Sequence, residues 1–76
     1  GGGATDAMLR AVWDAMPADA RLVLNGVTLE TEALLAQWHA RHGGHLMQVS
    51  ISDAQPLGRM RGWVAARPVT QWSVVK

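Results

Sequence analysis

The stretch that decides the fold of this chain is Arg21-Leu22-Val23-Leu24-Asn25-Gly26-Val27-Thr28-Leu29-Glu30. Residues 21–25 form a short, mainly apolar run without alternation, which is typical of a strand covered on both faces. A glycine then ends the run, and Thr28 offers a capping hydroxyl ahead of acidic residues that suit the first turn of a helix. We therefore expect a central parallel strand followed by a helix, which is the alternation of an α/β layer fold.

Two helices are expected around this strand. Apolar residues recur at helical spacing over 5–16, with Thr5 as the N-cap of a first helix. A second helix is expected over 28–42, with Gly43 as its left-handed cap. Trp13 and Trp38 fall on the apolar faces of these helices, so both are predicted to lie in the core.

The second half of the chain changes its period. Met47, Val49 and Ile51 alternate with Gln48, Ser50 and Ser52, which predicts a strand over 47–52 with one wet face. A last strand is expected from Val69 to Val75, with apolar residues on both faces. The long connection between them, Asp53 to Pro68, contains glycines, prolines and arginines and is interpreted as a functional or mobile loop.

Composition narrows the class of protein. The chain has 76 residues, of which 49% are hydrophobic and 17% charged, so some apolar surface is expected to face another part of the parent protein or another subunit. We interpret the whole chain as a single partial domain that forms a homo-oligomer through its open strand edges.

A net charge of +1 argues against nucleic acid as a partner, and cysteine is absent, so no thiolate metal site is possible. No signal peptide or long apolar run indicates a membrane, and a cytoplasmic location is the simplest expectation.

A glycine run, Gly1-Gly2-Gly3, opens the first helix. Turns of this kind let backbone approach a ligand closely, and in α/β folds they lie at the carboxyl ends of strands, where ligands bind. No strand precedes the run in this chain, so we expect the 76 residues to be the back part of a larger α/β domain.

Asn25 and Thr28 flank the turn after the first strand, and this turn is expected to face the crevice beyond the carboxyl edge of the sheet. They are candidate substrate contacts. The alternative is that Asn25 only satisfies backbone groups of the turn and that Thr28 only caps the helix.

The segment Arg59-Met60-Arg61-Gly62-Trp63 places two cations next to an aromatic ring. Guanidinium groups pair with carboxylates in a bidentate manner, while Trp63 can cover an apolar face, so Arg59, Arg61 and Trp63 suit a flat polycarboxylate ligand. The alternative is a solvated loop whose tryptophan packs on the domain or on a neighbouring subunit.

The sequence contains no convincing metal-binding or catalytic motif. His39, His42 and His45 lie close in sequence, but no carboxylate or thiolate stands at a fitting interval, so no metal site is expected. No serine, histidine and acid order and no phosphate-binding loop is present, and no catalytic acid or base can be named.

Four segments together resemble the precorrin-6Y methyltransferase (decarboxylating) family of cobalamin biosynthesis. They are Gly1-Gly2-Gly3, the stretch from Arg21 to Glu30, Gln55-Pro56-Leu57-Gly58 and Pro68-Val69-Thr70-Gln71-Trp72. The resemblance is to the last part of the C-terminal domain of that family and extends over essentially all of the chain. It implies the C-terminal portion of a Rossmann-like class I methyltransferase sheet, in which residues 22–25, 46–52 and 69–75 are the fifth, sixth and seventh strands. The seventh would lie between the other two, antiparallel to the sixth.

The resemblance also implies a function. The family uses S-adenosylmethionine to methylate a precorrin tetrapyrrole, with decarboxylation of an acetate side chain. Gly1, Gly2 and Gly3 would lie near the cofactor, whose main binding motif is absent from this chain. Asn25, Thr28, Arg59, Arg61 and Trp63 would bind the substrate, and the segment alone would be inactive. The competing hypothesis is a small, non-catalytic α/β module that binds a protein partner through its edge strand and the Trp63 loop.

Overall fold

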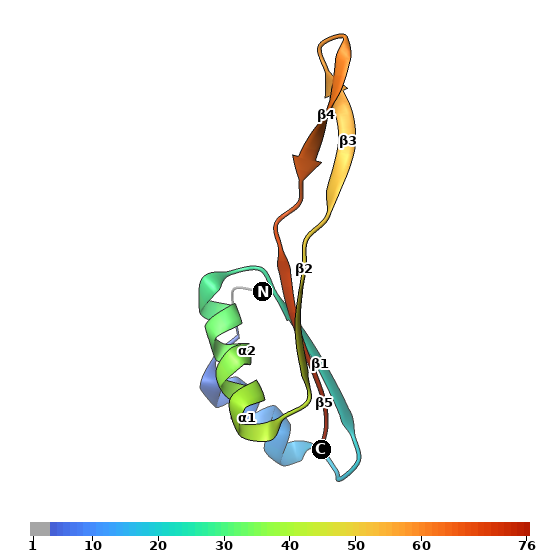
Figure 1. Ribbon diagram of the computed structural model, residues 1–76. Coiled ribbons are helices and arrows are strands. Elements are labelled where there is room, and N and C mark those ends of the chain that lie inside the picture. Colours follow the sequence, from blue (N-terminus) through green and yellow to red (C-terminus); the bar gives the residue numbers. More distant parts are fainter. Residues whose placement is uncertain (1–3) are drawn as a thin grey trace.

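The structure, a computed structural model, describes residues 4–76. Its elements are helices α1 (Asp6–Ala15) and α2 (Leu29–His42) and strands β1 (Arg21–Gly26), β2 (His45–Val49), β3 (Ser52–Leu57), β4 (Met60–Ala65) and β5 (Val69–Val75). In Figure 1 the two helices cover one face of a sheet formed by β1, β5 and β2, and the β3–β4 hairpin extends away from this body. The α/β class expected from the sequence is confirmed.

Both helices begin and end at the residues that local signals predicted. The Thr5 hydroxyl accepts a hydrogen bond of 3.1 Å from the Met8 amide at the start of α1. Thr28 accepts one of 3.1 Å from the Thr31 amide at the start of α2, and Gly43 follows the last turn with a φ of 73°. Neither helix in residues 4–76 is long and apolar enough to cross a membrane.

The three-stranded sheet has the order β1-β5-β2, and both pairs are antiparallel. β1 and β2 therefore run in the same direction with β5 between them, as the resemblance implied for its fifth, sixth and seventh strands. Within the described residues β1 lies at the edge of the sheet and pairs antiparallel with β5, so the expectation that residues 21–25 form a central parallel strand of a larger sheet stays a prediction. The burial of β1 alternates, because Leu22 and Leu24 pack on the core while Val23 lies exposed on the other face.

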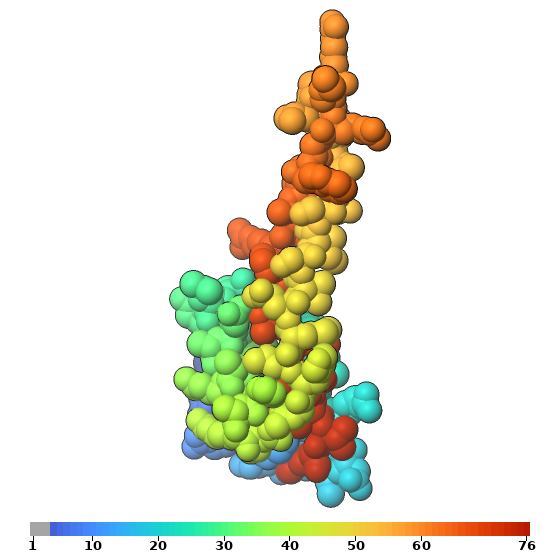
Figure 2. Space-filling view, viewed as in Figure 1, coloured from blue at the N-terminus to red at the C-terminus, as the bar shows by residue number. Residues whose placement is uncertain are grey.

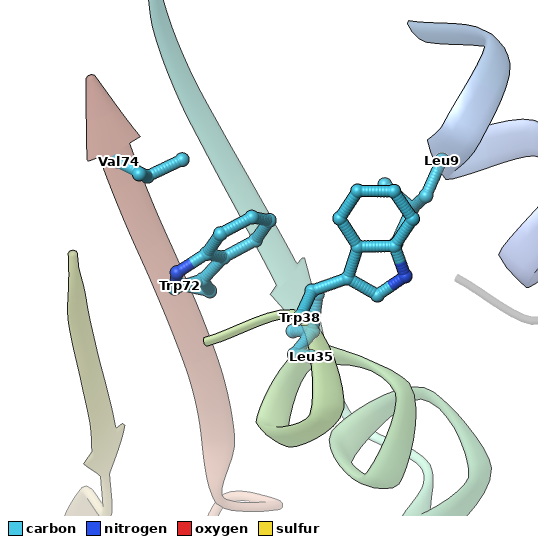
Figure 3. Close-up of a cluster of buried hydrophobic side chains, with 5 residues drawn as sticks. All are labelled: Leu9, Leu35, Trp38, Trp72 and Val74. Atoms are coloured by element: carbon cyan, nitrogen blue, oxygen red, sulfur yellow. The ribbon is translucent and has the colours of Figure 1, made fainter. Parts of the chain in front are cut away.

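The core lies between the helices and the sheet. Figure 3 shows its five buried side chains, which are Leu9, Leu35, Trp38, Trp72 and Val74. Trp13 packs beside them with its ring centroid 6.1 Å from that of Trp38 and 6.2 Å from that of Trp72, so the predicted core role of Trp13 and Trp38 is confirmed. The two buried indole groups are satisfied, since Nε1 of Trp72 donates to the Gly43 carbonyl at 2.8 Å and Nε1 of Trp38 donates to Oδ1 of Asp6 at 3.0 Å.

The sheet face away from the helices is uncovered in this chain. Met47 and Val49 were expected on the buried side of their strand, and this expectation is wrong here: both are exposed on the helix-free face. Leu46 instead packs on the core, because it lies opposite the buried Trp72 in the ladder. The sixth-strand segment is also shorter than expected, since β2 ends at Val49.

Residues 53–68 are not the long loop that the sequence suggested. They form most of a β-hairpin, in which β3 and β4 pair from Ser52–Ala65 to Leu57–Met60 around a two-residue turn. The turn is possible because Gly58 takes a φ of 60°, the positive value that a II′ hairpin turn needs at its first position. The pair Leu57 and Met60 closes the turn, and Pro56 and Arg61 form the next pair. Hydrogen-bonded and non-hydrogen-bonded pairs alternate along an antiparallel ladder, so Pro56 occupies a non-hydrogen-bonded position and removes no ladder bond.

The hairpin continues the β2–β5 ladder with one irregularity. Two residues separate β2 from β3, but three separate β4 from β5. The extra residue is the arrangement of a β-bulge, which bends and twists a ribbon. The amide of Ala66 still donates to the Ile51 carbonyl at 2.9 Å, so the two strands remain joined across the bend.

Candidate functional site

The carboxyl ends of β1 and β2 lie at one edge of the sheet, which we call the carboxyl edge. Gly26, Thr70 and Gln48 form one row of the ladder across β1, β5 and β2 at this edge. The first turn of α2 lies directly over the row, since a Cβ added at Gly26 would overlap Cγ2 of Thr31. In α/β sheets with this strand direction, ligands bind beyond the carboxyl edge.

Glu32 joins α2 to this row. Its Oε2 accepts a hydrogen bond of 2.8 Å from the Thr70 hydroxyl and one of 3.3 Å from Nε2 of Gln48. Thr70 is only 4% exposed, so the carboxylate satisfies a buried hydroxyl and holds the helix against two strands at once. The sequence pointed to Glu32 only as a first-turn carboxylate, because a contact over 38 positions leaves no local signal.

The structure places Asn25 and Thr28 in different surroundings. Oδ1 of Asn25 accepts a hydrogen bond of 2.9 Å from Nε2 of Gln71, on the helix-free face of the sheet. Thr28 caps α2 on the other side, and its hydroxyl also donates to Oγ1 of Thr31 at 3.0 Å. Both residues belong to the carboxyl edge, but Asn25 bonds on the helix-free face of the sheet while Thr28 bonds on the face that α2 covers.

Arg59, Arg61 and Trp63 do come together. They line a hollow of about 690 Å³ on the hairpin, with Ala54, Met60 and Gly62 completing its wall. Arg61 and Trp63 are two positions apart on β4, so strand geometry points both to the same face. Figure 2 shows the hairpin standing clear of the body. The hollow is lined only by hairpin residues, whereas Asn25 lies on β1 and Thr28 at the start of α2.

The hollow has the chemistry of a site for a flat anion. Within residues 4–76, neither Arg59 nor Arg61 has an ion pair or a hydrogen bond to another side chain, so both guanidinium groups are available. Trp63 is 78% exposed and offers its ring face beside them. Guanidinium groups bind carboxylates through parallel hydrogen bonds, and an indole covers an apolar ring system.

The remaining candidates have other surroundings. Gly1, Gly2 and Gly3 lie outside the described residues. The ring centroid of His42 lies 4.3 Å from that of Trp13 and 5.0 Å from that of Trp38, so His42 belongs to the aromatic cluster. The described part of the chain contains no group of three or more histidine, aspartate or glutamate side chains arranged to hold a metal ion.

Curated relatives share the whole length of this chain. A precorrin-6Y C(5,15)-methyltransferase [decarboxylating] from Sinorhizobium sp is 47% identical over 76 residues, which are 100% of this chain and 18% of the relative. The enzyme of the same name from Mycobacterium tuberculosis is 47% identical over 77 residues, covering 100% of this chain and 20% of the relative. The chain therefore spans about a fifth of the length of these relatives.

Solved structures share its fold. The C-terminal domain of precorrin-6Y C5,15-methyltransferase from Rhodobacter capsulatus superposes with a TM-score of 0.93 at 51% identity, over 100% of this chain and 41% of that one. A precorrin-6Y C5,15-methyltransferase from Geobacter metallireducens gives a TM-score of 0.74 over 99% of this chain and 41% of that one; at 23% identity it shows the fold alone. The β1-β5-β2 arrangement is thus the C-terminal part of a class I methyltransferase sheet. The model of the precorrin methyltransferase domain matches residues 1–76, and the chain belongs to that family.

Proposed function

We propose that this chain is the last part of the C-terminal domain of an S-adenosylmethionine-dependent methyltransferase. The enzyme methylates a precorrin tetrapyrrole in cobalamin biosynthesis and decarboxylates an acetate side chain. The observation that carries this proposal is 47% identity along the entire chain to relatives that bear this name. The cytoplasmic location expected from the sequence stays a prediction.

The open surfaces of the sheet support a role as part of a larger domain. β1 has a free edge among the described residues, and the helix-free face exposes Val23, Met47, Val49 and Val75. Apolar side chains on a sheet face favour a covering layer, because their burial stabilises a domain by roughly 25 cal/mol per Å². The rest of the methyltransferase domain is the partner that we propose for this face and edge.

The hairpin hollow supports the substrate assignment. Arg59 and Arg61 would pair with precorrin carboxylates while Trp63 covers part of the macrocycle, and Asn25 and Thr28 would line the crevice at the carboxyl edge. Such contacts orient a ring carbon and exclude water, which is what a methyl transfer needs from the protein. Glu32 contributes indirectly, because it fixes the α2 turn that carries Thr28.

S-adenosylmethionine supplies an electrophilic methyl group when it is bound. The cofactor would be held by Gly1, Gly2 and Gly3 and by parts of the protein outside this chain. The chain's own residues bind and orient the macrocycle, whose electron-rich ring is the nucleophile. None of them is assigned as a catalytic acid or base.

Titration with S-adenosylmethionine and with its demethylated product tests the assignment. Binding by a longer protein that contains this chain, and not by the 76 residues alone, is the expected result. A second candidate function, a non-catalytic interaction module, is favoured by the exposed Trp63 hairpin. If both folded proteins fail to bind either ligand, the module is the better description.

The substrate clamp has its own test. The double substitution Arg59→Ala and Arg61→Ala in the longer protein should raise the KM for precorrin at least tenfold, since hydrogen bonds between charged groups contribute about 1.5–3 kcal/mol each. Arg67→Ala is the matched control, because Arg67 is an exposed arginine of the same ribbon that does not line the hollow. Unchanged affinity and turnover in the double variant would contradict the clamp.

A further inference from the structure

Two amide side chains, which we call the amide pair, lie at the carboxyl end of the helix-free face. Asn25 and Gln71 are partners in the ladder between β1 and β5, and Met47 continues their row on β2. Nε2 of Gln71 donates a hydrogen bond of 2.9 Å to Oδ1 of Asn25. The neighbouring part of this face is mainly apolar, with Val23 and Val49 exposed beside Met47. The amide pair is therefore a polar spot on a surface for which a covering layer is proposed.

The hydrogen bond between the two amides fixes the direction in which Asn25 can donate. Because Oδ1 of Asn25 faces Gln71, its Nδ2 is turned away from β5, toward the edge of β1 at which the rest of the domain is proposed to join. Nδ2 carries two N–H donors, and within the described residues neither makes a hydrogen bond. Donors without an acceptor are costly once a surface is covered. Since ligands bind beyond the carboxyl edge of such a sheet, a substrate oxygen is the acceptor that suits this place.

The amide pair also lies in a part of the ladder that is free of cations. The rows from Leu24 to Gly26, together with their partners on β5 and β2, contain no lysine or arginine. A carboxylate held by Nδ2 of Asn25 would therefore receive hydrogen bonds from a neutral donor. It would lack the full compensation of charge that a guanidinium group provides.

A neutral donor suits a carboxylate that has to leave. In the decarboxylation of an acetate side chain, the bond between the methylene and carboxylate carbons breaks and its electron pair passes into the conjugated ring. Carbon dioxide leaves, and the methylene carbon recovers the electron pair with one proton from solvent to become a methyl group. An ion pair with arginine would stabilise the charged ground state more than the transition state, in which the charge moves into the ring. A neutral amide holds the carboxylate in position without this penalty.

We propose that the amide pair binds the acetate carboxylate of precorrin that is lost as carbon dioxide. Nδ2 of Asn25 donates to this carboxylate, and Gln71 is a positioning residue that acts through Asn25. The inference rests on the proposed function and deepens it, because it assigns the reacting carboxylate to named residues. It does not depend on the clamp formed by Arg59 and Arg61.

Mass spectrometry of the products of the full-length protein tests the amide pair, because methyl transfer and loss of carbon dioxide change the mass differently. Asn25→Ala removes the donor. Gln71→Glu is similar in size, but an ionised carboxylate only accepts hydrogen bonds, so Nδ2 of Asn25 must turn toward it and Oδ1 toward the substrate. Ser73→Ala is the matched control, since Ser73 lies two residues from Gln71 on the same face of β5.

Both amide variants should keep most of the methyl transfer and release carbon dioxide at least tenfold more slowly, since a hydrogen bond to a charged group contributes about 1.5–3 kcal/mol. A methylated product that retains its acetate group should then accumulate. Ser73→Ala should leave both rates within about twofold of the wild type. Urea unfolding and calorimetric binding of S-adenosylmethionine establish that each variant is folded, and if Asn25→Ala fails this check, Gln71→Glu decides alone.

Two results would overturn the inference. One is wild-type release of carbon dioxide by a folded amide variant, and the other is an equal loss of both steps in such a variant. In either case a wild-type protein that makes the methylated, decarboxylated product leaves the proposed function in place. A wild-type protein that performs neither step removes the proposed function itself, and the inference with it.

Discussion

Nε1 of Trp38 donates a hydrogen bond of 3.0 Å to Oδ1 of Asp6 and so ties the first turn of α1 to the middle of α2. Trp38 is only 2% exposed, so the carboxylate satisfies a donor that solvent scarcely reaches. The second oxygen of Asp6 accepts from Arg10 at 2.8 Å, an exposed pair one helical turn along. The same carboxylate lies at the N-terminus of α1, where negative charge is favourable. The start of α1 is therefore fixed by a contact that crosses the core.

Replacing Asp6 by alanine should lower the free energy of unfolding by about 1–3 kcal/mol, because the indole donor of Trp38 is then left without an acceptor. Asp6→Asn, which keeps an acceptor, should lose less. Asp14→Ala is the control, since Asp14 is an exposed carboxylate of the same helix. Urea unfolding followed by tryptophan fluorescence measures all three. Equal losses for Asp6→Ala and Asp14→Ala would show that only net charge matters.

The contact between Glu32 and Thr70 allows a double-mutant cycle. Glu32→Leu should cost about 1–3 kcal/mol of unfolding free energy, because the buried Thr70 hydroxyl loses its 2.8 Å acceptor. Thr70→Val removes the donor too, so the double variant should be less unstable than the sum of the two single variants, with a coupling of roughly 1 kcal/mol. Chemical unfolding of the four proteins gives the coupling directly. Additive losses would mean that the pair does not hold α2 to β5.

Gly26 has a steric role that is independent of its backbone freedom. A Cβ at this position would overlap Cγ2 of Thr31, so Gly26→Ala should push α2 from β1 and destabilise the fold by about 1–3 kcal/mol. Adding Thr31→Ser removes the overlapping methyl group while keeping the hydroxyl, and it should restore part of the loss. Thermal unfolding of the single and double variants makes the comparison. A double variant no more stable than Gly26→Ala would place the strain elsewhere.

The helix boundaries could be predicted because their causes are local. Thr5, Thr28 and Gly43 act within one turn of their own positions, and the structure confirms where each lies; Gly43 has the positive φ expected of a left-handed cap, but its ψ of −147° lies outside the αL region. The faces of the strands depend on distant partners. Met47 was assigned to a buried face, but the face of β2 that meets the helices is set by its register with β5. The face that carries Met47 has no cover among the described residues.

In the candidate site, too, features with local causes could be predicted and features set by distant contacts could not. Arg61 and Trp63 were expected to act together, and their spacing on one strand does bring them to one hollow. The prediction that they lie on a long loop was wrong, because Pro56 and Gly62 were interpreted as loop residues. A proline at a non-hydrogen-bonded position and a glycine near Leu57 both fit a hairpin. The distance between this hollow and Asn25 follows from the bend and length of the ribbon, which no local pattern encodes.

Replacement of Trp63 should weaken substrate binding without changing the stability of the fold. The indole is exposed on the hairpin, so Trp63→Ala should change the free energy of unfolding of the chain by less than about 0.5 kcal/mol. In the full-length protein the same substitution should raise the KM for precorrin about tenfold, which corresponds to roughly 1.4 kcal/mol, because the proposed contact with the macrocycle is lost. Val64→Ala is the matched control, since Val64 is an exposed apolar residue on the opposite face of the same strand, and its KM should stay within about twofold. Steady-state kinetics and urea unfolding on both variants decide the matter: if Val64→Ala raises KM as much as Trp63→Ala, the hollow is not the face that binds the substrate.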